Sequence, residues 1–395
     1  MVHRSFMPSA SQKWFFTLLS IFLLASTHLW SGCSDAPSNE VTIEERDGVT
    51  YVTNTGTRVW NDHDAAPIQF TLEQSFGAEN EPEEAMLATV RGIVVDADGI
   101  VYVLDEGKNR LIAFNPDGSL LWSVGRAGEG PGEFNGAFGM VSDGDSTIYI
   151  SNQRSTRIDA WSTDGTFIES VNLSEMELMG TIASYVDGML VLSGWAQGGL
   201  QRFHFVDPTR WTHERTVDID IGLELHDRFY VNVETFPYED GFWLGHIDTY
   251  QIGYYTPDGT LQKRIERPVF NDDLVGGVMA RDERSWTIYS NVSAPRVLSD
   301  GSLIVTSSWP ANVSNPVQHF EQSRSPDAPE TIWASALDLF TPEGHFRGRL
   351  QWEDSGGRSS IPDLGRLHTT GPNGALYTST TSPFPHVRRY AVTIE

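Results

Sequence analysis

Short apolar runs recur along residues 90–395, and tight turns of Asp or Asn with Gly separate many of them. In the first copy, Val94-Val95 and Ile100–Val103 flank a turn that ends in Asp98-Gly99. Such turns between apolar runs predict β-hairpins, because both turn positions need positive φ angles that Asn, Asp and Gly tolerate. Five further copies follow, at Asp143-Gly144, Asp187-Gly188, Asp240-Gly241, Asp300-Gly301 and Asn373-Gly374.

A second series of turns follows the first at a nearly constant offset in the first four copies. Its members are Asp117-Gly118, Asp164-Gly165, Asp207-Pro208, Asp258-Gly259 and Glu343-Gly344. In the fifth copy the offset is longer, and Trp309 to Ile332 is predicted to be an insertion in a surface loop. Each unit therefore has four strands. Because one such sheet cannot bury both of its apolar faces alone, the pattern predicts an all-β, six-bladed β-propeller with four-stranded antiparallel blades.

The sixth unit lacks an outer strand, because the sequence ends shortly after Val387–Ile394. The segment 49–60 contains two apolar runs around Asn54-Thr55-Gly56 and has no partner within its own region. We therefore expect the N-terminal and C-terminal strands to pair and to close the ring through residues 49–60. Closure would remove the exposed sheet edge that otherwise templates aggregation.

Two stretches resemble NHL-type blades: Asp105–Leu111 with Asp117-Gly118, and Ser151–Ile158 with Asp164-Gly165. Between them, Val124–Phe134 resembles the glycine-rich connector of bacterial six-bladed β-propeller lipoproteins. The resemblance covers residues 90–170 and weakens afterwards. It implies the same propeller fold and a location at the cell envelope.

The N-terminal region is typical of an export signal. A basic stretch precedes the apolar residues 14–25, and Ser31-Gly32-Cys33 resembles a bacterial lipobox, in which the cysteine is lipidated and becomes the first mature residue. Ordinary secretion by cleavage nearby is the alternative, since Trp30 replaces the usual aliphatic residue. We expect a signal peptide at 1–32, a flexible tether at 33–48 and the propeller at 49–395. With Ser34 after the cysteine, the resemblance implies the outer membrane of a Gram-negative bacterium.

Cysteine usage and charge exclude several classes of function. Cys33 is the only cysteine, so thiolate zinc sites, internal disulfides and a cysteine nucleophile in the propeller are excluded. The chain has 53 acidic and 27 basic residues and a net charge of −26. Nucleic acid is not an expected partner, because binding it requires a basic patch. Lysine occurs only at positions 13, 108 and 263, which favours a saline environment over a merely acidic exported protein.

Loops between second and third strands, and between blades, gather at one end of a propeller's channel. The candidate ligand contacts at this end are Asp105, Asn152, Trp195, His246, Asp248, Trp309, His386 and Arg126. Asp105 and Asn152 stand at repeating positions, together with Arg110 and Arg157, which also fits hydrogen bonds that hold turns and blades. Glu133 is expected to hold the glycine-rich connector.

Four of the candidates do not repeat from blade to blade and therefore fit a single site better: Trp195, His246, Trp309 and His386. Packing in the interior is the alternative explanation for each of them. We expect a non-enzymatic binding or interaction scaffold at the cell envelope. It would be attached to lipid through Cys33, and its partner would be an envelope protein or a small molecule.

Two enzyme classes with related folds are alternatives. A calcium-dependent lactonase of the gluconolactonase type would use a cluster such as Asp105, Asn152 and Asp248, since calcium prefers oxygen ligands. A metal-dependent lyase would need converging histidines, for which His246, His368 and His386 are candidates. No cofactor is assigned, and calcium remains open, because the fold does not imply the function.

Overall fold

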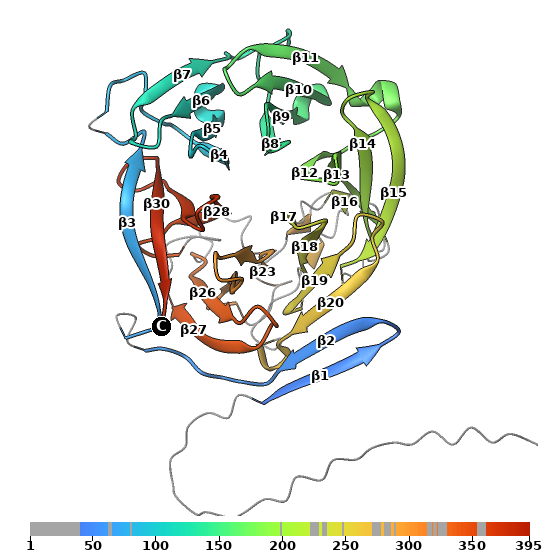
Figure 1. Cartoon of the computed structure of the whole chain (residues 1–395), viewed down its shortest axis with the longest axis vertical. Coiled ribbons are helices and arrows are strands. Elements are labelled where there is room, and N and C mark those ends of the chain that lie inside the picture. Colours follow the sequence, from blue (N-terminus) through green and yellow to red (C-terminus); the bar gives the residue numbers. More distant parts are fainter. Residues whose placement is uncertain are drawn as a thin grey trace, which may run out of the picture. The chain divides into compact units, whose positions relative to one another are not determined.

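The computed structural model describes residues 40–61, 65–79, 81–197, 200–221, 229–230, 235–246, 249–270, 278–279, 286–287, 290–313, 318, 322, 330–353 and 361–395. All of them belong to one compact unit, Pro37–Glu395. These residues form six radially arranged sheets around a central axis, which confirms the predicted all-β, six-bladed propeller (Figure 1). In this part of the chain, no helix has the length and apolarity that crossing a membrane requires.

Each blade is a meander of antiparallel strands that runs from the channel outward. Blades 1 to 3 contain β4 (Val90–Val95), β5 (Val101–Asp105), β6 (Arg110–Phe114) and β7 (Leu120–Val124); β8 (Ala137–Ser142), β9 (Thr147–Asn152), β10 (Arg157–Ser162) and β11 (Phe167–Asn172); and β12 (Thr181–Val186), β13 (Met189–Gln197), β14 (Leu200–Asp207) and β15 (Thr212–Asp220), with β16 (Phe229–Tyr230) beside β13.

Blades 4 to 6 repeat this order. They contain β17 (Thr235–Tyr238), β18 (Gly241–Gly245), β19 (Gln251–Tyr255) and β20 (Leu261–Glu266); β23 (Asn291–Val292) with β24 (Arg296–Val297), β25 (Leu303–Pro310), β26 (Trp333–Phe340) and β27 (Phe346–Trp352); and β28 (Arg366–Thr370), β29 (Leu376–Thr380), β30 (His386–Ile394) and β3 (Ile68–Phe76). Outside the blades are the pair β21 (Val278–Met279) and β22 (Trp286–Thr287), and the 3-10 helices η1 (Glu106–Lys108), η2 (Gln153–Ser155), η3 (Leu173–Met176) and η4 (Pro268–Phe270).

The two predicted series of turns join the first to the second and the third to the fourth strands of the blades. In blade 3, Asp187 and Gly188 both have positive φ, 51° and 74°, as a two-residue hairpin turn requires. Blade 4 differs by one residue, because Tyr238 pairs with Gly241 and the chain reverses at Glu239-Asp240 rather than at Asp240-Gly241. Turn residues that the sequence displays locally therefore mark where the blades reverse to within one residue.

The ring closes through pairing of an N-terminal with the C-terminal strand, as predicted, but the N-terminal strand is not the expected one. Strand β3 pairs antiparallel with β30, from Ile68 opposite Ile394 to Phe76 opposite Val387 (Figure 1). The expectation that residues 49–60 complete blade 6 is wrong. Phe76 is fully buried in the apolar cluster between blades 6 and 1, and burial of this kind decides which segment fills the outer position.

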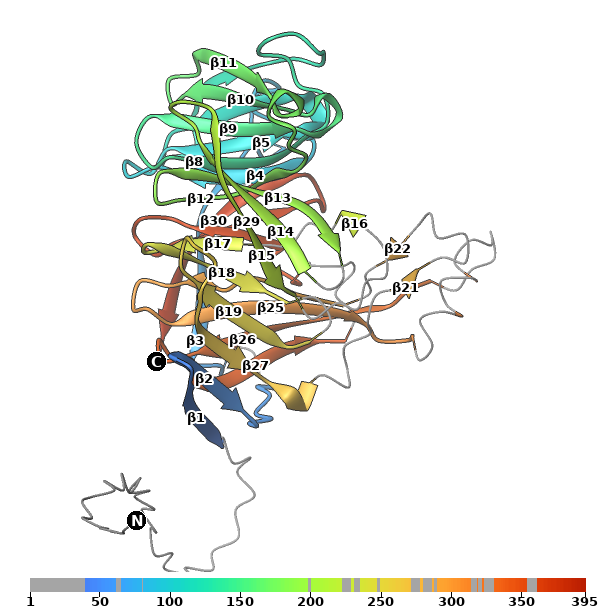
Figure 2. The ribbon, with the colours of Figure 1, turned by 90° about the vertical axis from the view of Figure 1, so that its right-hand side faces the viewer.

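The earlier segment instead enlarges blade 4. Strands β1 (Val41–Arg46) and β2 (Val49–Asn54) form a hairpin, and β2 pairs parallel with β20 (Figure 1). Seen from the side, the hairpin lies near β27 (Figure 2). Its turn residues, Asp47 and Gly48, have φ of 52° and 81°. A regular strand therefore occupies residues 41–46, inside the segment expected to be a tether.

The side chain of Asn54 attaches this hairpin to blade 5. Its Nδ2 donates a hydrogen bond to Gly344 O at 3.0 Å, and its Oδ1 accepts one from Phe346 N at 2.8 Å. Asn54 is fully buried, so both groups need these partners. Nearby, Arg267 Nη2 donates to Gly56 O at 2.9 Å. The hairpin is thus held by blades 4 and 5 together.

The predicted insertion begins later than expected. Trp309 belongs to β25 and pairs with Ala334 of β26, and the two strands continue as a long hairpin. Beyond them, Ala311 N still donates to Ile332 O at 2.8 Å. Most of the remaining insertion lies outside the described residues.

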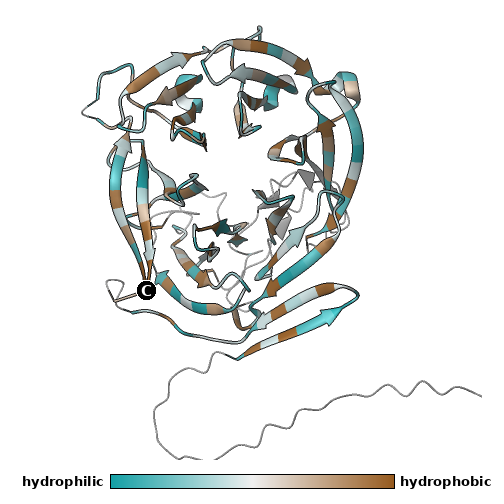
Figure 3. Ribbon diagram, viewed as in Figure 1, coloured by the Kyte–Doolittle hydropathy of each residue, from teal (hydrophilic) through white to brown (hydrophobic). Residues whose placement is uncertain are grey.

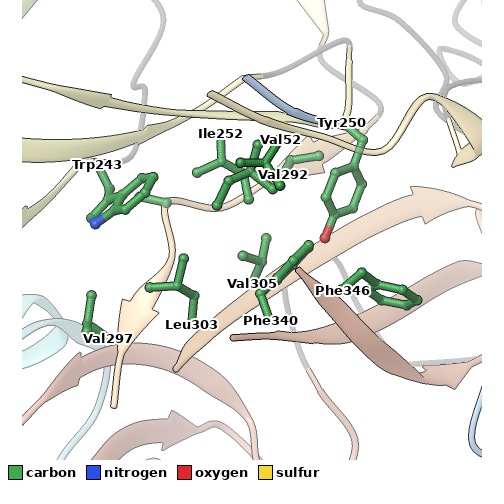
Figure 4. Close-up of a cluster of buried hydrophobic side chains, with 12 residues drawn as sticks. Val52, Trp243, Tyr250, Ile252, Val292, Val297, Leu303, Val305, Phe340 and Phe346 are labelled. Atoms are coloured by element: carbon green, nitrogen blue, oxygen red, sulfur yellow. The ribbon is translucent and has the colours of Figure 1, made fainter. Parts of the chain in front are cut away.

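In the described residues, one large apolar cluster lies at each of the six junctions between neighbouring blades, and a small one of Trp309, Ala334 and Ala336 lies between β25 and β26. Hydrophobic stretches recur along the strands that supply them (Figure 3). At the junction of blades 4 and 5, Trp243 and Ile252 face Leu303 and Val305 (Figure 4). Each blade therefore buries its two faces against two different neighbours.

A buried ion cluster lies at the same junction. Asp338 of β26 accepts hydrogen bonds from Arg267 Nη1 at 2.7 Å, from Arg349 Nε at 2.7 Å and from the Tyr250 hydroxyl. All four side chains are at most 1% exposed. Although burial acts to raise it, the two guanidinium charges keep the pKa of Asp338 below its usual range. The carboxylate is thus the counter-charge for two arginines that have no contact with bulk water.

We expect Asp338→Asn to lower the free energy of unfolding by about 3 to 5 kcal/mol, because it leaves buried guanidinium charges without their partner. Urea denaturation measures this loss. Asp218→Asn is the matched control, since Asp218 pairs with Arg202 on the exposed surface and its removal should cost less than about 1 kcal/mol. Equal losses in the two variants would contradict the assignment.

The closing strand is tested by two substitutions within β3. Phe76→Ala removes a fully buried ring that packs near Phe114 and Tyr377, and should destabilise the protein by about 3 to 5 kcal/mol. Leu72→Ala changes a side chain that is 52% exposed and should alter stability by less than about 0.5 kcal/mol. Thermal melting compares the two, and a neutral Phe76→Ala would show that β3 does not close the ring.

Candidate functional site

A cavity of about 410 Å³ lies on the central axis, lined by the innermost strands of all six blades. Blades 1 to 6 contribute, among others, Arg91, Phe138, Tyr185, Phe236, Arg296 and His368. The convergence follows from topology, because the first strand of every blade faces the axis (Figure 1). It is the place where side chains from all six repeats meet.

β-Bulges in four of these strands supply residues to the cavity wall. The register with the second strand skips Arg91 in β4, Phe138 in β8, Ala183 in β12 and His368 in β28. All four of these extra residues line the cavity. A bulge redirects a side chain out of the normal alternation, and bulges are frequent beside functional sites. The inner strands are crowded here, since a Cβ on Gly139 would lie 2.4 Å from Ile182 O.

Two arginines of the wall pack on aromatic rings of other blades. Arg91 Cζ lies 5.0 Å from the ring centre of Phe138, and its Nε donates to Glu106 Oε2 at 2.9 Å. Arg296 Cζ lies 5.1 Å from the ring centre of Phe236. Cation–π contacts of this kind hold a guanidinium in place while its edge still offers N–H donors.

Arg296 also connects blades 5 and 6. Its Nε donates to His368 O at 2.7 Å, and its Nη1 donates to Ala294 O at 2.8 Å. The guanidinium is nearly buried, at 5% exposure, so it is a rigid cation in the wall. Arg366 of β28 adds a third, more exposed guanidinium.

The remaining polar groups of the wall are neutral. Burial, and then the charges of Arg366 and Arg296, lower the pKa of His368 well below its usual value, and its Nε2 lies 2.7 Å from Ser379 Oγ. The Thr235 hydroxyl is buried and makes no hydrogen bond within the described structure. Among the described lining residues there is no Asp or Glu.

The sequence candidate Asp105 lies at the end of β5, and its side chain is fully buried. Its Oδ1 accepts a hydrogen bond from Thr89 N at 2.9 Å, and its Oδ2 lies 3.2 Å from Arg110 Nε. Arg110 Nη2 in turn donates to Met86 O at 2.6 Å. The pair therefore holds the segment that enters blade 1, as expected from its repeating position.

Asn152 has the equivalent place in blade 2. Its Oδ1 accepts from Asn135 N at 3.0 Å, and its Nδ2 donates to Asp159 Oδ2 at 2.7 Å. Arg157 pairs with Asp159 and donates from Nη2 to Gly130 O at 2.9 Å. The hydrogen bonds predicted for the repeating positions are thus confirmed in both blades, and neither Asp105 nor Asn152 lines the central cavity.

Arg126 lies in the glycine-rich connector between β7 of blade 1 and β8 of blade 2. Its Nε donates to Glu133 Oε1 at 2.8 Å, while Glu133 Oε2 accepts from Gly130 N at 2.9 Å. The hydrogen bond from Gly130 N–H is the main cause that lowers the pKa of the Glu133 carboxyl group, and the hydrogen bond from Arg126 lowers it further. Glu133 therefore holds the connector as expected.

The unrepeated candidates lie in separate places. His246 follows β18 in blade 4, Trp309 lies in blade 5 with Arg349 Cζ 5.6 Å from its ring centre, and His386 begins β30 in blade 6. Trp195 lies in β13 and pairs with Tyr230 of β16, and the structure describes its backbone only. Asp248 is outside the described residues. The described candidates thus come from different blades.

Metal ligands were part of both enzyme alternatives. Among the residues that the structure describes, no group of three or more His, Cys, Asp or Glu side chains could hold a metal ion. The proposed calcium set includes Asp248, whose position is not described. Of the proposed histidine set, only His368 lines the central cavity.

Of the cavity residues the sequence analysis named only His368 as a site candidate, and it missed, among others, Arg91, Phe138, Phe236 and Arg296. A signal was present for the first two, because each precedes a glycine at the same place in the first strand of its unit. Arg91 also interrupts an otherwise apolar run. The bulges that direct these side chains to the axis depend on pairing with the second strand, which a single strand does not reveal.

Buried His246 gives the protein a measurable sensitivity to acid. Burial, and then Arg264, lower its pKa to about 4, so it is neutral in the folded state where an unfolded histidine binds a proton. Stability is therefore retained above about pH 6.5 and lost as the pH falls toward 4; between pH 7 and 5 this histidine alone should account for roughly 2 kcal/mol. Urea denaturation of His246→Gln at both pH values should show a smaller difference than the wild type. The exposed His213→Gln is the control, and an unchanged pH dependence in His246→Gln would refute the assignment.

No sequence-family model and no curated protein matches this chain. Solved structures do resemble it. A member of the DUF4221 family from Bacteroides vulgatus is 9% identical, with a TM-score of 0.54, over 83% of this chain and 99% of that one. A predicted exported protein from Bacteroides fragilis is 10% identical, with a TM-score of 0.55, over 88% and 100%. Virginiamycin B lyase from Staphylococcus aureus is 11% identical, with a TM-score of 0.41, over 83% and 100%. At these identities the similarity shows the propeller fold alone.

Proposed function

We propose that this protein is a non-enzymatic binding protein of the cell envelope that takes a small ligand in its central cavity. The observation that carries the proposal is the convergence of all six innermost strands on one cavity of about 410 Å³. This volume is within the range of roughly 300 to 1,000 Å³ that small-molecule sites occupy. Such sites combine apolar walls with a few fixed polar groups, which is the composition found here.

The construction of the wall supports binding by a prepared site. Phe138 and Phe236 supply apolar surface, while the Arg296 guanidinium is fixed by two backbone carbonyls. Polar groups that are already positioned lose little conformational entropy when a ligand arrives. By contrast, Asp105 and Asn152 are engaged in holding the connectors between blades.

The proposed location depends on the N-terminal sequence. Cys33 in its lipobox-like context supports attachment to the outer membrane, and the tether after it would place the propeller close to the bilayer. A structural neighbour that is predicted to be exported agrees with this location. The acidic, lysine-poor composition supports a saline surrounding.

The proposal is tested by filling the cavity. Ala183 is a bulge residue of the wall, and Ala183→Phe should occupy the space of a ligand while the blades still form. A library of small metabolites of varied charge is screened by thermal shift on the form that begins at Ser34. A ligand at about 100 times its Kd stabilises the folded state by about 2.7 kcal/mol. We expect stabilising compounds for the wild type and none for Ala183→Phe.

Ala127→Phe is the matched control, because Ala127 is exposed in the connector and does not line the cavity. It should respond to the same compounds as the wild type. If compounds stabilise Ala183→Phe and the wild type equally, the ligand does not bind in the cavity. If none stabilises the wild type, a protein partner becomes the better explanation.

A further inference from the structure

We infer that the ligand of the central cavity is an organic anion, a small carboxylate with an aromatic or apolar body. This inference rests on the proposed function and specifies the chemical class of its ligand. It is drawn from the charge of the cavity wall, the stacking of its arginines, its buried hydroxyl and its size.

The charge of the wall is opposite to that of the whole chain. Acidic residues outnumber basic ones by 53 to 27, so a patch of average composition would be acidic. The described wall nevertheless contains Arg91, Arg296 and Arg366 and no Asp or Glu. A molecule with net charge −26 repels anions from most of its surface, and the guanidinium groups in the wall offer an anion an attractive contact there, although that of Arg91 is already paired with Glu106.

Guanidinium groups suit carboxylates by shape as well as by charge. Each presents five N–H donors in a planar fork that matches the two oxygens of a carboxylate. Arg296 donates to two backbone carbonyls, and Arg91 bonds Glu106, so both have partners already. The inference requires only that a guanidinium can accommodate a further acceptor beside its existing ones, which the number of its donors permits.

The rest of the wall calls for an apolar body on the ligand. Phe138, Phe236, Met140 and Tyr185 line the same cavity. An inorganic anion would leave most of about 410 Å³ unfilled and these surfaces without a partner. The buried Thr235 hydroxyl makes no hydrogen bond within the described structure, and a ligand oxygen would satisfy it.

The experiment compares three probes of similar size and different charge: benzoate, benzamide and benzylamine. Each is titrated by calorimetry at pH 7 into the wild type, Arg366→Gln, Arg202→Gln and Ala183→Phe. Arg366 lines the cavity but its side chain is exposed, so Arg366→Gln should fold, and its melting curve checks this. Arg202 is the control arginine, since it pairs with Asp218 on the outer strands of blade 3.

We expect benzoate to bind the wild type more tightly than benzamide, and benzylamine not to bind. Arg366→Gln should weaken benzoate binding roughly tenfold to a hundredfold, as loss of one charged hydrogen-bond partner does, while Arg202→Gln should not change it. Ala183→Phe should abolish it.

Other outcomes separate the two proposals. If benzamide or benzylamine binds as well as benzoate and Ala183→Phe abolishes that binding, the cavity is a ligand site but the anion inference is wrong. Benzoate binding that is equal in the wild type and Arg366→Gln also overturns the inference. Benzoate binding that survives Ala183→Phe lies elsewhere and overturns both. If benzoate does not bind at millimolar concentration, the anion inference fails, and the metabolite screen decides the proposed function separately.

Discussion

Two-sided burial of every blade is the constraint on which the rest of this structure depends. A four-stranded sheet with two apolar faces is unstable alone, and here each face is covered by a different neighbour through one apolar cluster per junction. A linear stack would leave two faces exposed. Only a closed ring covers all of them, and pairing of β3 with β30 completes it. The central cavity is a geometric result of that closure, because the innermost strands must then face a common axis.

The fold could be predicted from the sequence because its turns are local features. Asp187-Gly188 forms its hairpin turn from two neighbouring residues, and five further Asp-Gly or Asn-Gly pairs mark the turns of the other blades, with a displacement of one residue in blade 4. The closing strand could not be predicted as reliably, since both β2 and β3 have strand-like sequences and their partners, β20 and β30, are distant in sequence. The hairpin turn at Asp47-Gly48 carried the same local signal, but it lay in a segment that was assigned to a tether.

The candidate site could be predicted only in part. Positions that repeat, such as Asp105 and Asn152, are conspicuous in a sequence because they repeat, and in this structure they support the connectors. The cavity residues differ from blade to blade: Arg91, Phe138 and His368 occupy the same bulge position. Residues that repeat from blade to blade therefore identify the scaffold, whereas these site residues share one position, the bulge of the first strand, and differ there in residue type. Finding this position requires knowledge of the register between the first and second strands, which the spacing of the repeats does not contain.

The order of elements along the chain has a mechanical consequence. Tension applied through the N-terminal segment reaches β1 first, then β2, and only afterwards the strand that closes the ring. The β1 and β2 hairpin is attached by the short β20 ladder, by Asn54 and, just after β2, by the hydrogen bond from Arg267 to Gly56 O, whereas β3 has its own long ladder with β30. The hairpin can therefore yield under load while the circular array of blades stays shut. A pulling force on the N-terminal segment would thus detach the β1 and β2 hairpin before it opens the ring.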